Sequence, residues 1–212
     1  VDLDVDPSVP IQVGLDFGLT PAAVIGQRLP SGTWQILDEI VTFDMGLERF
    51  GHQLLADLNA KYPGMQILVW GDPAGMARDA IYEVTAFDFL KTLGLKAQPA
   101  PSNDFKVRRE AGAAPMQRLI NGKPGLLVDT KCKLLRKSLA GGYHFKRVSV
   151  GSGQERFRDA PNKNEHSHVG DAFGYLLLGG GEHKRMTRPS QPSNKTFVAQ
   201  TVANSEFDIF AR

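Results

Sequence analysis

The sequence predicts one α/β domain built on a mixed β-sheet with helices packed against it. Three observations lead to this prediction. Three short apolar stretches near the N-terminus are separated by turn residues, a segment with helical periodicity then precedes a continuous apolar run, and further helical segments follow. With 212 residues, the chain is long enough for one domain with a sizeable core.

The first three apolar stretches predict an antiparallel meander. The strands are expected at 11–17, 22–29 and 33–43. Gly18 and Pro21 punctuate the first connection, and the pair Ser31-Gly32 is a turn signal in the second. Strands joined by such short connections pair with each other and run in opposite directions.

A crossover to a parallel strand is expected next. The stretch "GLERFGHQLLADLNAKY" (46–62) has apolar residues at a helical period, and Pro63-Gly64 ends that helix. The stretch "MQILVWGDPAG" (65–75) contains a short, continuous apolar run, which is typical of a buried parallel strand. A strand that is reached through a helix can pair in parallel with the first strand.

The second half of the chain predicts alternating short elements. Helices are expected at 84–94 and 104–120, the latter interrupted at Pro115, and short strands at 95–100 and 125–129. We further expect a basic helix at 130–142 with Thr130 as N-cap, a β-hairpin at 143–158 and a closing helix at 166–180. The chain therefore divides into a linker (1–10), a domain (11–181) and a flexible polar tail (182–212).

Composition excludes several classes of protein. Cys132 is the single cysteine, which rules out an internal disulfide and suits a reducing compartment. No apolar run approaches the roughly 20 residues that a membrane span needs, so we expect no membrane partner. The chain starts without Met on an acidic segment, which we interpret as an excised domain or a processed product.

Charge is distributed unevenly along the chain. The formal net charge is +2, yet between Asp104 and Arg147 eleven Lys and Arg residues stand against three Asp and Glu residues. A basic segment of this kind indicates a polyanion as partner. The alternative is that these residues form solvated helix faces and contribute only to solubility.

Three carboxylates occupy corresponding positions in the predicted fold. Asp16 ends the first strand, Asp72 ends the strand "QILVWGD" (66–72), and Asp171 lies in the last helix. If the first and fourth strands are neighbours, Asp16 and Asp72 emerge side by side, and the helix that carries Asp171 can pack across that edge. Converging carboxylates repel one another unless cations are bound, and hard oxygen ligands suit Mg²⁺ or Mn²⁺.

A pair of such ions activates water and stabilises the leaving oxygen in phosphodiester cleavage. Taken singly, each acid also has an ordinary structural interpretation. Asp16 could be a turn or cap residue, Asp72 could open a turn before Pro73, and Asp171 could pair with His168 three residues earlier.

The stretches around these acids resemble a known family. "VGLDFGLTPAAVIG", "ILVWGDPAG" and "NKNEHSHVGDAFGYLL" are similar to the three carboxylate motifs of the nuclease domain in large terminase subunits of tailed bacteriophages. The closing motif carries the most specific features, which are Lys163, His166, His168, Asp171-Ala172 and Tyr175. The resemblance spans residues 11–180 in matching order.

The resemblance implies an RNase H-like fold with an extra β-hairpin, and a metal-dependent endonuclease that cuts concatemeric double-stranded viral DNA during packaging. Asp16, Asp72 and Asp171 would be catalytic and would bind two Mg²⁺ or Mn²⁺ ions, with Asp16 bridging them. His168 and Lys163 would contact the scissile phosphate or orient water. The hairpin 143–158 lies where terminase nucleases carry an element that handles DNA.

The same resemblance implies the surroundings of the enzyme. The partners would be double-stranded DNA and, in a full-length subunit, the portal, the procapsid and the small terminase subunit, in the host cell cytoplasm. The candidate phosphate contacts are Lys106, Arg108, Arg109, Lys131, Lys133 and Arg136. Family members also carry a Walker A loop in an ATPase motor. This sequence contains no such loop, so we expect a nuclease domain that cuts DNA without translocating it.

Three other functions fit parts of the sequence. A RuvC-type junction resolvase would share the chemistry. An actin- or sugar-kinase-like ATPase would use the loop from Asp16 to Thr20 for phosphate, but its second phosphate loop and adenosine motif are missing. A non-catalytic DNA-binding domain would need the basic surface alone, and its binding would survive replacement of Asp16.

Overall fold

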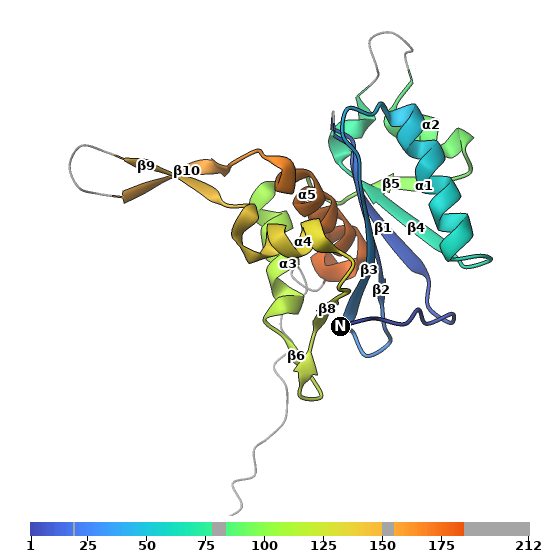
Figure 1. The fold of residues 1–212 in the computed structure, drawn as a ribbon, viewed down its shortest axis with the longest axis horizontal. Helices are drawn as coiled ribbons and strands as arrows, with labels where there is room; N and C mark the ends of the chain where they lie inside the picture. The colour runs from blue at the N-terminus through green and yellow to red at the C-terminus, as the bar shows by residue number, and fades with distance from the viewer. Residues whose placement is uncertain (19, 78–83, 150–154, 185–212) are drawn as a thin grey trace, which may run out of the picture.

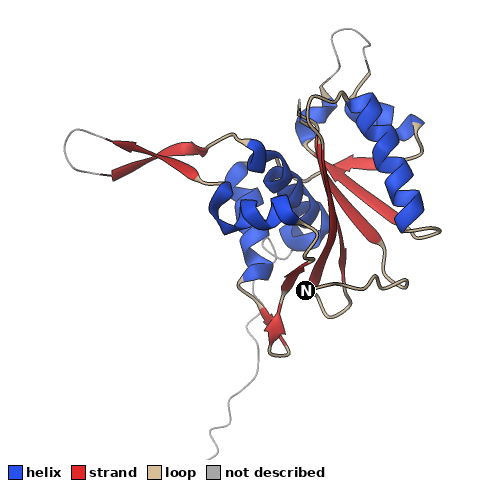
Figure 2. Ribbon diagram, viewed as in Figure 1, coloured by secondary structure: helices blue, strands red, loops and turns tan. Residues whose placement is uncertain are grey.

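A six-stranded mixed β-sheet forms the centre of the molecule, with helices on both faces (Figures 1 and 2). The computed structural model describes residues 1–18, 20–77, 84–149 and 155–184. The strands, in their spatial order, are β5 (Ala97–Pro99), β4 (Ile67–Gly71), β1 (Ile11–Asp16), β2 (Ala22–Arg28), β3 (Trp34–Val41) and β8 (Leu126–Val128). The helices α1 (Leu47–Lys61) and α2 (Ala86–Thr92) cover one face, and α3 (Phe105–Met116), α4 (Lys133–Lys137) and α5 (Glu165–Leu177) cover the other.

The sheet topology confirms the predicted mixture of directions. β1, β2 and β3 form the expected antiparallel meander, with Val13 opposite Ile25 and Val24 opposite Glu39. β4 returns through α1 and pairs in parallel with β1, so that Leu15 lies opposite Gly71. The first and fourth strands are therefore neighbours, as the placement of the acids requires.

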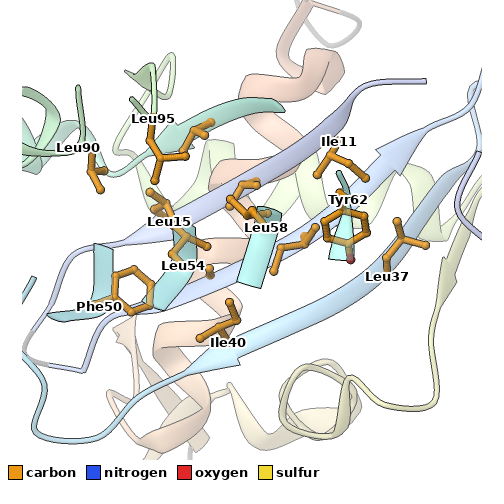
Figure 3. Packing of buried hydrophobic residues seen from close by; sticks show 14 residues of the cluster. Ile11, Leu15, Leu37, Ile40, Phe50, Leu54, Leu58, Tyr62, Leu90 and Leu95 are labelled. Carbon is orange, nitrogen blue, oxygen red and sulfur yellow. The ribbon is translucent and has the colours of Figure 1, made fainter. Parts of the chain in front are cut away.

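The face of the sheet towards α1 holds an apolar core (Figure 3). Side chains alternate across a strand, so Ile11 and Leu15 of β1 point to this face and meet Phe50, Leu54 and Leu58 of α1. All five are at most 1% exposed. The helical period of 46–62 predicted this contact, because it places those three residues on one side of the helix.

The opposite face of the sheet receives α5 at close range. A Cβ atom at position 14 would overlap the carbonyl oxygen of Ala172 and the Cβ atom of Leu176. Gly14 thus lets the backbone of α5 lie directly on β1. A second core, which includes Val24, Trp34 and Leu176, fills the space between α5 and strands β2 and β3. This packing fixes where α5 presents Asp171 relative to Asp16.

Two helix predictions were wrong in detail. α3 continues through Pro115 to Met116 instead of being interrupted there, because a proline next to the helix end removes only one late hydrogen bond. The basic helix starts later than expected, since α4 follows Cys132 and not Thr130, and a π-helical segment (Ser138–Gly142) continues to its predicted end. A residue of strand β3 caps the first N–H groups of α4. The carboxylate of Glu39 accepts hydrogen bonds from the backbone N–H groups of Leu134 and Leu135 at 2.8 and 2.7 Å.

Two hairpins lie outside the main sheet. The small hairpin β6 (Leu119–Ile120) and β7 (Lys123–Pro124) was not predicted, although Asn121-Gly122 between them, both with positive φ, is a turn signal. The expected longer hairpin is formed by β9 (Phe145–Ser149) and β10 (Glu155–Pro161) and projects from the body of the molecule (Figure 1). Its predicted turn, Gly151-Ser152-Gly153, lies outside the described residues.

Both predicted domain boundaries fall next to packed residues. In the segment 1–10, the amide of Gln27 donates to the carbonyl of Asp6 at 2.7 Å, and the N–H of Leu3 donates to Asp129 at 2.9 Å. Glu182, expected in the tail, is 1% exposed. Of the predicted tail, the structure describes residues 182–184. No helix within the described ranges is both long enough and apolar enough to span a membrane.

Candidate functional site

Two of the predicted acids meet at the carboxyl edge of strands β1 and β4. Asp16 is the last residue of β1, and Asp72 follows β4 directly. The N–H of Asp72 donates to the carbonyl of Leu15 at 3.1 Å, so the parallel pairing continues up to this position. Because the two strands are adjacent and parallel, both acids reach the same edge of the sheet.

The start of α5 is anchored beside this edge. Asn164 is the N-cap, with its side chain accepting a hydrogen bond from the N–H of His166 at 2.9 Å, while Ser167 closes a capping box. The amide of Asn164 also donates to the carbonyl of Gly142 at 2.8 Å, which ties α5 to the segment after α4. The helix then presents His168 and Asp171, three residues apart, on one side.

Asp16 is a buried carboxylate with a histidine partner. Its side chain is 11% exposed, and its Oδ2 lies 2.8 Å from Nδ1 of His168. Burial raises the pKa of Asp16, the hydrogen bond from His168 opposes this shift, and the nearby charge of Asp171 adds to it. Asp16 and Asp171 are therefore close enough to repel each other in a poorly solvated environment.

Asp171 is held by three donors. Its Oδ1 accepts hydrogen bonds from Nη1 of Arg108 at 2.6 Å and from the hydroxyl of Tyr143 at 3.0 Å. Its Oδ2 accepts a hydrogen bond from Nζ of Lys163 at 2.5 Å. The two cations differ in mobility, because the Arg108 side chain is 10% exposed whereas that of Lys163 is 65% exposed.

Arg108 packs against two aromatic rings. Its guanidinium carbon lies 4.6 Å from the ring centre of Tyr175 and 5.8 Å from that of Phe105. Burial alone would lower the pKa of Arg108, but Asp171 and the two tyrosines beside it raise the pKa above its usual value. Arg108 therefore lies buried beside Asp171 and not on an exposed surface, and its contact with DNA phosphate stays a prediction. The residue is a buried counter-charge for Asp171.

Asp72 lies at the same edge but has a different immediate partner. Its Oδ1 accepts a hydrogen bond from the N–H of Ala74 at 2.8 Å and caps a short 3₁₀ turn. Burial raises the pKa of the Tyr175 phenol, and the charge of Arg108 opposes this shift. The charges of Asp72 and Asp171 also raise this pKa, so Tyr175 lies near both acids. Within the described residues, no group of three or more His, Cys, Asp or Glu side chains is arranged to hold a metal ion. The convergence of the three acids on metal ions stays a prediction.

The donors at this edge nevertheless suit a divalent cation. Asp16 and Asp171 offer hard oxygen atoms, and the raised pKa of Asp16 comes from burial and from its neighbouring carboxylate, both of which a bound cation would offset. On Asp171, Oδ2 is held by an exposed lysine that can swing away. His168 contacts Asp16 and not Asp171, so the pairing within the helix that we considered is not formed.

The remaining predicted contacts lie on the surface. Lys106 and Arg109 on α3, and Lys131, Lys133 and Arg136 in and beside α4, are all exposed. Arg109 pairs with its neighbour Glu110 at 2.7 Å. Sequence reasoning missed the roles of Arg108 and Tyr143. For Arg108 a signal existed, because Arg108, Ala111, Gly112 and Pro115 share the helical spacing of one buried face.

No protein-family model and no curated protein matches the chain. Solved structures do match it. The large terminase of the thermophilic bacteriophage D6E aligns with a TM-score of 0.59 and 18% identity, over 84% of this chain and 41% of that one. The nuclease domain of the P22 large terminase aligns at 0.55 and 12% identity, over 82% and 84% of the two chains.

The large terminase nuclease domain of bacteriophage SPP1, solved with bound Mn, aligns with a TM-score of 0.52 and 18% identity, over 79% of this chain and 85% of that one. The chain therefore has the RNase H-like fold found in large terminase nuclease domains. It spans less than half of the D6E large terminase.

Proposed function

We propose that this protein is a metal-dependent endonuclease that cuts double-stranded concatemeric viral DNA during genome packaging. One observation carries the proposal: Asp16, at the carboxyl edge of β1 beside Asp72, contacts His168, which lies one turn before Asp171 on α5, in a fold that aligns with a nuclease domain solved with bound Mn. The portal, the procapsid and the small terminase subunit, in the host cytoplasm, would be the setting of a longer protein that contains this domain.

Different residues of the site would bind the metal, hold the carboxylates in place and contact the DNA. Asp16 and Asp171 would hold Mg²⁺ or Mn²⁺, with Asp72 as a further ligand once its side chain leaves Ala74. A cation pair bound there would supply Lewis acidity to the scissile phosphate and to the attacking water. His168 holds the Asp16 carboxylate, and Arg108 and Tyr143 hold Oδ1 of Asp171, so that Oδ2 would be the oxygen available to a cation once Lys163 has moved. Lys163, displaced from Asp171, would meet a phosphate of the DNA.

The substrate would lie across the exposed basic residues next to this edge. Two helices that pack against α5, α3 and α4, carry Lys106, Arg109, Lys133 and Arg136, and Lys131 lies just before α4. Lys146 and Arg147 on β9 extend the basic surface along the hairpin. Contacts to phosphate position DNA without reading its sequence, so the enzyme would have little base preference and strong salt dependence.

Plasmid cleavage tests the proposal. The native chain is incubated with Mn²⁺, Mg²⁺ or EDTA beside Asp16→Asn, Asp171→Asn and the control Asp44→Asn. Asp44 is exposed and has a positive φ that asparagine also adopts, so its replacement makes the same chemical change away from the site. We expect cleavage that needs the metal, falls at least about 100-fold in the two site variants and persists in the control.

Cleavage that survives both site substitutions would refute the assignment of the carboxylates. A folded native chain that binds the plasmid but never cuts it would instead support a non-catalytic DNA-binding domain.

A further inference from the structure

A groove with a mostly apolar lining lies between α3, the π-helical segment after α4 and the base of the β9–β10 hairpin. Its volume is about 230 Å³. α5 contributes buried lining residues, among them Phe173, which is 3% exposed. At the end of the groove next to the hairpin, the ring centres of Phe105 and Phe145 lie 5.5 Å apart, which joins α3 to the start of β9 (Figure 1).

Two large apolar side chains in this lining are exposed. Met116, at the end of α3, is 44% exposed, and Leu139, in the π-helical segment, is 38% exposed. Ala113, Phe145 and Pro161 add half-buried apolar surface between them and the hairpin. Exposed apolar side chains that border an apolar hollow are typical of a surface that another segment of chain covers.

Basic residues surround this apolar lining. Arg109 belongs to it, and its ion pair with Glu110 lies on the surface, where such a pair contributes little and can exchange for another carboxylate. The acid of the lining, Asp171, is buried and already paired with Arg108. The exposed cations in the lining or next to it along the chain are Lys106, Arg109, Lys137 and Lys146. A segment with apolar and acidic side chains would therefore match both the lining and its rim.

The sequence contains two stretches in which acidic and apolar residues alternate. The first, "VDLDVD" (1–6), already packs elsewhere, since the N–H of Leu3 donates to Asp129 and the amide of Gln27 donates to the carbonyl of Asp6. The second, "EFDIF" (206–210), lies outside the described residues. In an extended chain, its apolar side chains at 207 and 209 share one side and its carboxylates the other.

The segment 206–210 is close enough along the chain to reach the groove. Gly174 in the lining and Lys184 are joined by the end of α5 and its continuation, on the order of 15 Å of helix. The residues between Lys184 and Glu206 can span up to roughly 70 Å when extended. A tether within one chain raises the effective concentration to about the millimolar range, so a short segment can occupy the groove without high intrinsic affinity.

We propose that residues 206–210 bind in this groove of the same molecule, with their apolar side chains against Met116 and Leu139 and their two carboxylates beside the basic rim. DNA is another polyanion that the rim could attract. We favour the segment because phosphate would not use the apolar lining, whereas Phe207 and Ile209 would. The proposal does not depend on the nuclease activity.

Paramagnetic broadening of methionine signals in the full chain tests the proposal. Ala211→Cys provides a site for a nitroxide label, because Cys132 is fully buried and burial raises the pKa of its thiol to about 12, which leaves it unreactive. The five Met residues carry ¹³C-methyl labels, and Met116→Leu assigns the signal of Met116. We expect the nitroxide to broaden this signal strongly and that of Met65, which packs on the opposite face of the sheet, far less.

Matched variants separate binding from chance proximity. Phe207→Ser/Ile209→Ser should weaken binding about tenfold or more, because two apolar side chains lose their burial. Phe197→Ser/Val198→Ser makes the same kind of change in the same tail, away from the acids, and should leave the broadening of Met116 unchanged. On the groove side, Leu139→Gln, at an exposed residue, should weaken binding severalfold.

Equal broadening of Met116 and Met65, or broadening of Met116 that Phe207→Ser/Ile209→Ser leaves unchanged, would overturn the proposal. Broadening that requires the nitroxide and the ¹³C label to be on different molecules of a mixture would overturn binding within one molecule and make the groove a contact between two copies. A Met116 signal that ignores the tail variants but shifts when duplex DNA is added would overturn the proposal in favour of a nucleic-acid contact.

Discussion

On strand β1, the side chains that face α1 are Ile11, Val13 and Leu15, whereas the residues that face α5 are Gln12, Gly14 and Asp16. The first set is fully buried among aliphatic side chains and contributes roughly 1.5–3 kcal/mol for each large residue. In the second set, Gln12 lines a cavity, Gly14 allows α5 to pack closely, and Asp16 belongs to the candidate active site. A single strand thus presents aliphatic packing on one face and the residues of the candidate site on the other, so substitutions on its two faces should have different effects on activity.

The largest expected loss of stability comes from the chemical face. Arg108→Gln would leave Asp171 buried without its main counter-charge and should lower the free energy of unfolding by about 3–5 kcal/mol. Arg109→Gln, next along the chain but exposed and paired only with Glu110, should cost less than about 1 kcal/mol. Urea denaturation measures both.

The double variant Arg108→Gln/Asp171→Asn isolates the pair. If the cost of Arg108→Gln comes from the unpaired carboxylate, the double variant should regain about 1–3 kcal/mol relative to the sum of the single changes. Strict additivity would mean that Arg108 stabilises the fold by packing on Tyr175 alone.

On the opposite face, Leu54→Ala should cost about 2–5 kcal/mol, because the side chain is fully buried and would leave a cavity in the core shown in Figure 3. The fraction of molecules that remains folded should cleave plasmid DNA at the native rate. A cleavage rate per folded molecule that falls together with stability would contradict the separation of the two faces.

Gly14→Ala should affect stability and activity together. The added methyl group overlaps the backbone of α5, so we expect a loss of about 1–3 kcal/mol and a displaced Asp171. Gly46→Ala is the matched control, because a Cβ atom there meets nothing within 4 Å. Thermal unfolding and plasmid cleavage of both variants check this prediction, and normal cleavage by a stable Gly14→Ala protein would contradict it.

The smallest expected effect concerns the exposed basic residues. Lys133→Gln should leave stability unchanged and lower DNA affinity modestly, reducing the slope of log affinity against log salt by about 0.9 if the lysine meets one phosphate. Lys91→Gln on α2, on the other side of the sheet, should leave that slope unchanged. The affinity of each variant for a DNA duplex, measured at several salt concentrations, distinguishes the two variants.

The strand order and the edge that gathers the acids could be predicted from local patterns, because alternation and helical period reflect which face of each element is buried. The meander, the crossover to β4 and the positions of Asp16 and Asp72 followed in this way. The cap of α4 by Glu39 and the pairing of Arg108 with Asp171 join residues that are 95 and 63 positions apart. No local pattern contains such pairs, so the length of α4 and the partners of Asp171 needed the structure.

We propose that Asp16 serves metal binding and not the fold. Burial raises the pKa of Asp16, so its ionised form costs folding free energy at pH above the usual carboxyl range, and Asp16→Asn removes that cost. The direct measurement is the melting temperature at pH 7 of the native chain and of Asp16→Asn, each with and without Mn²⁺. We predict that Asp16→Asn without metal melts at or above the native temperature and that Mn²⁺ stabilises only the native chain. Equal stabilisation of both proteins by Mn²⁺, or a large loss of stability in metal-free Asp16→Asn, would contradict the account.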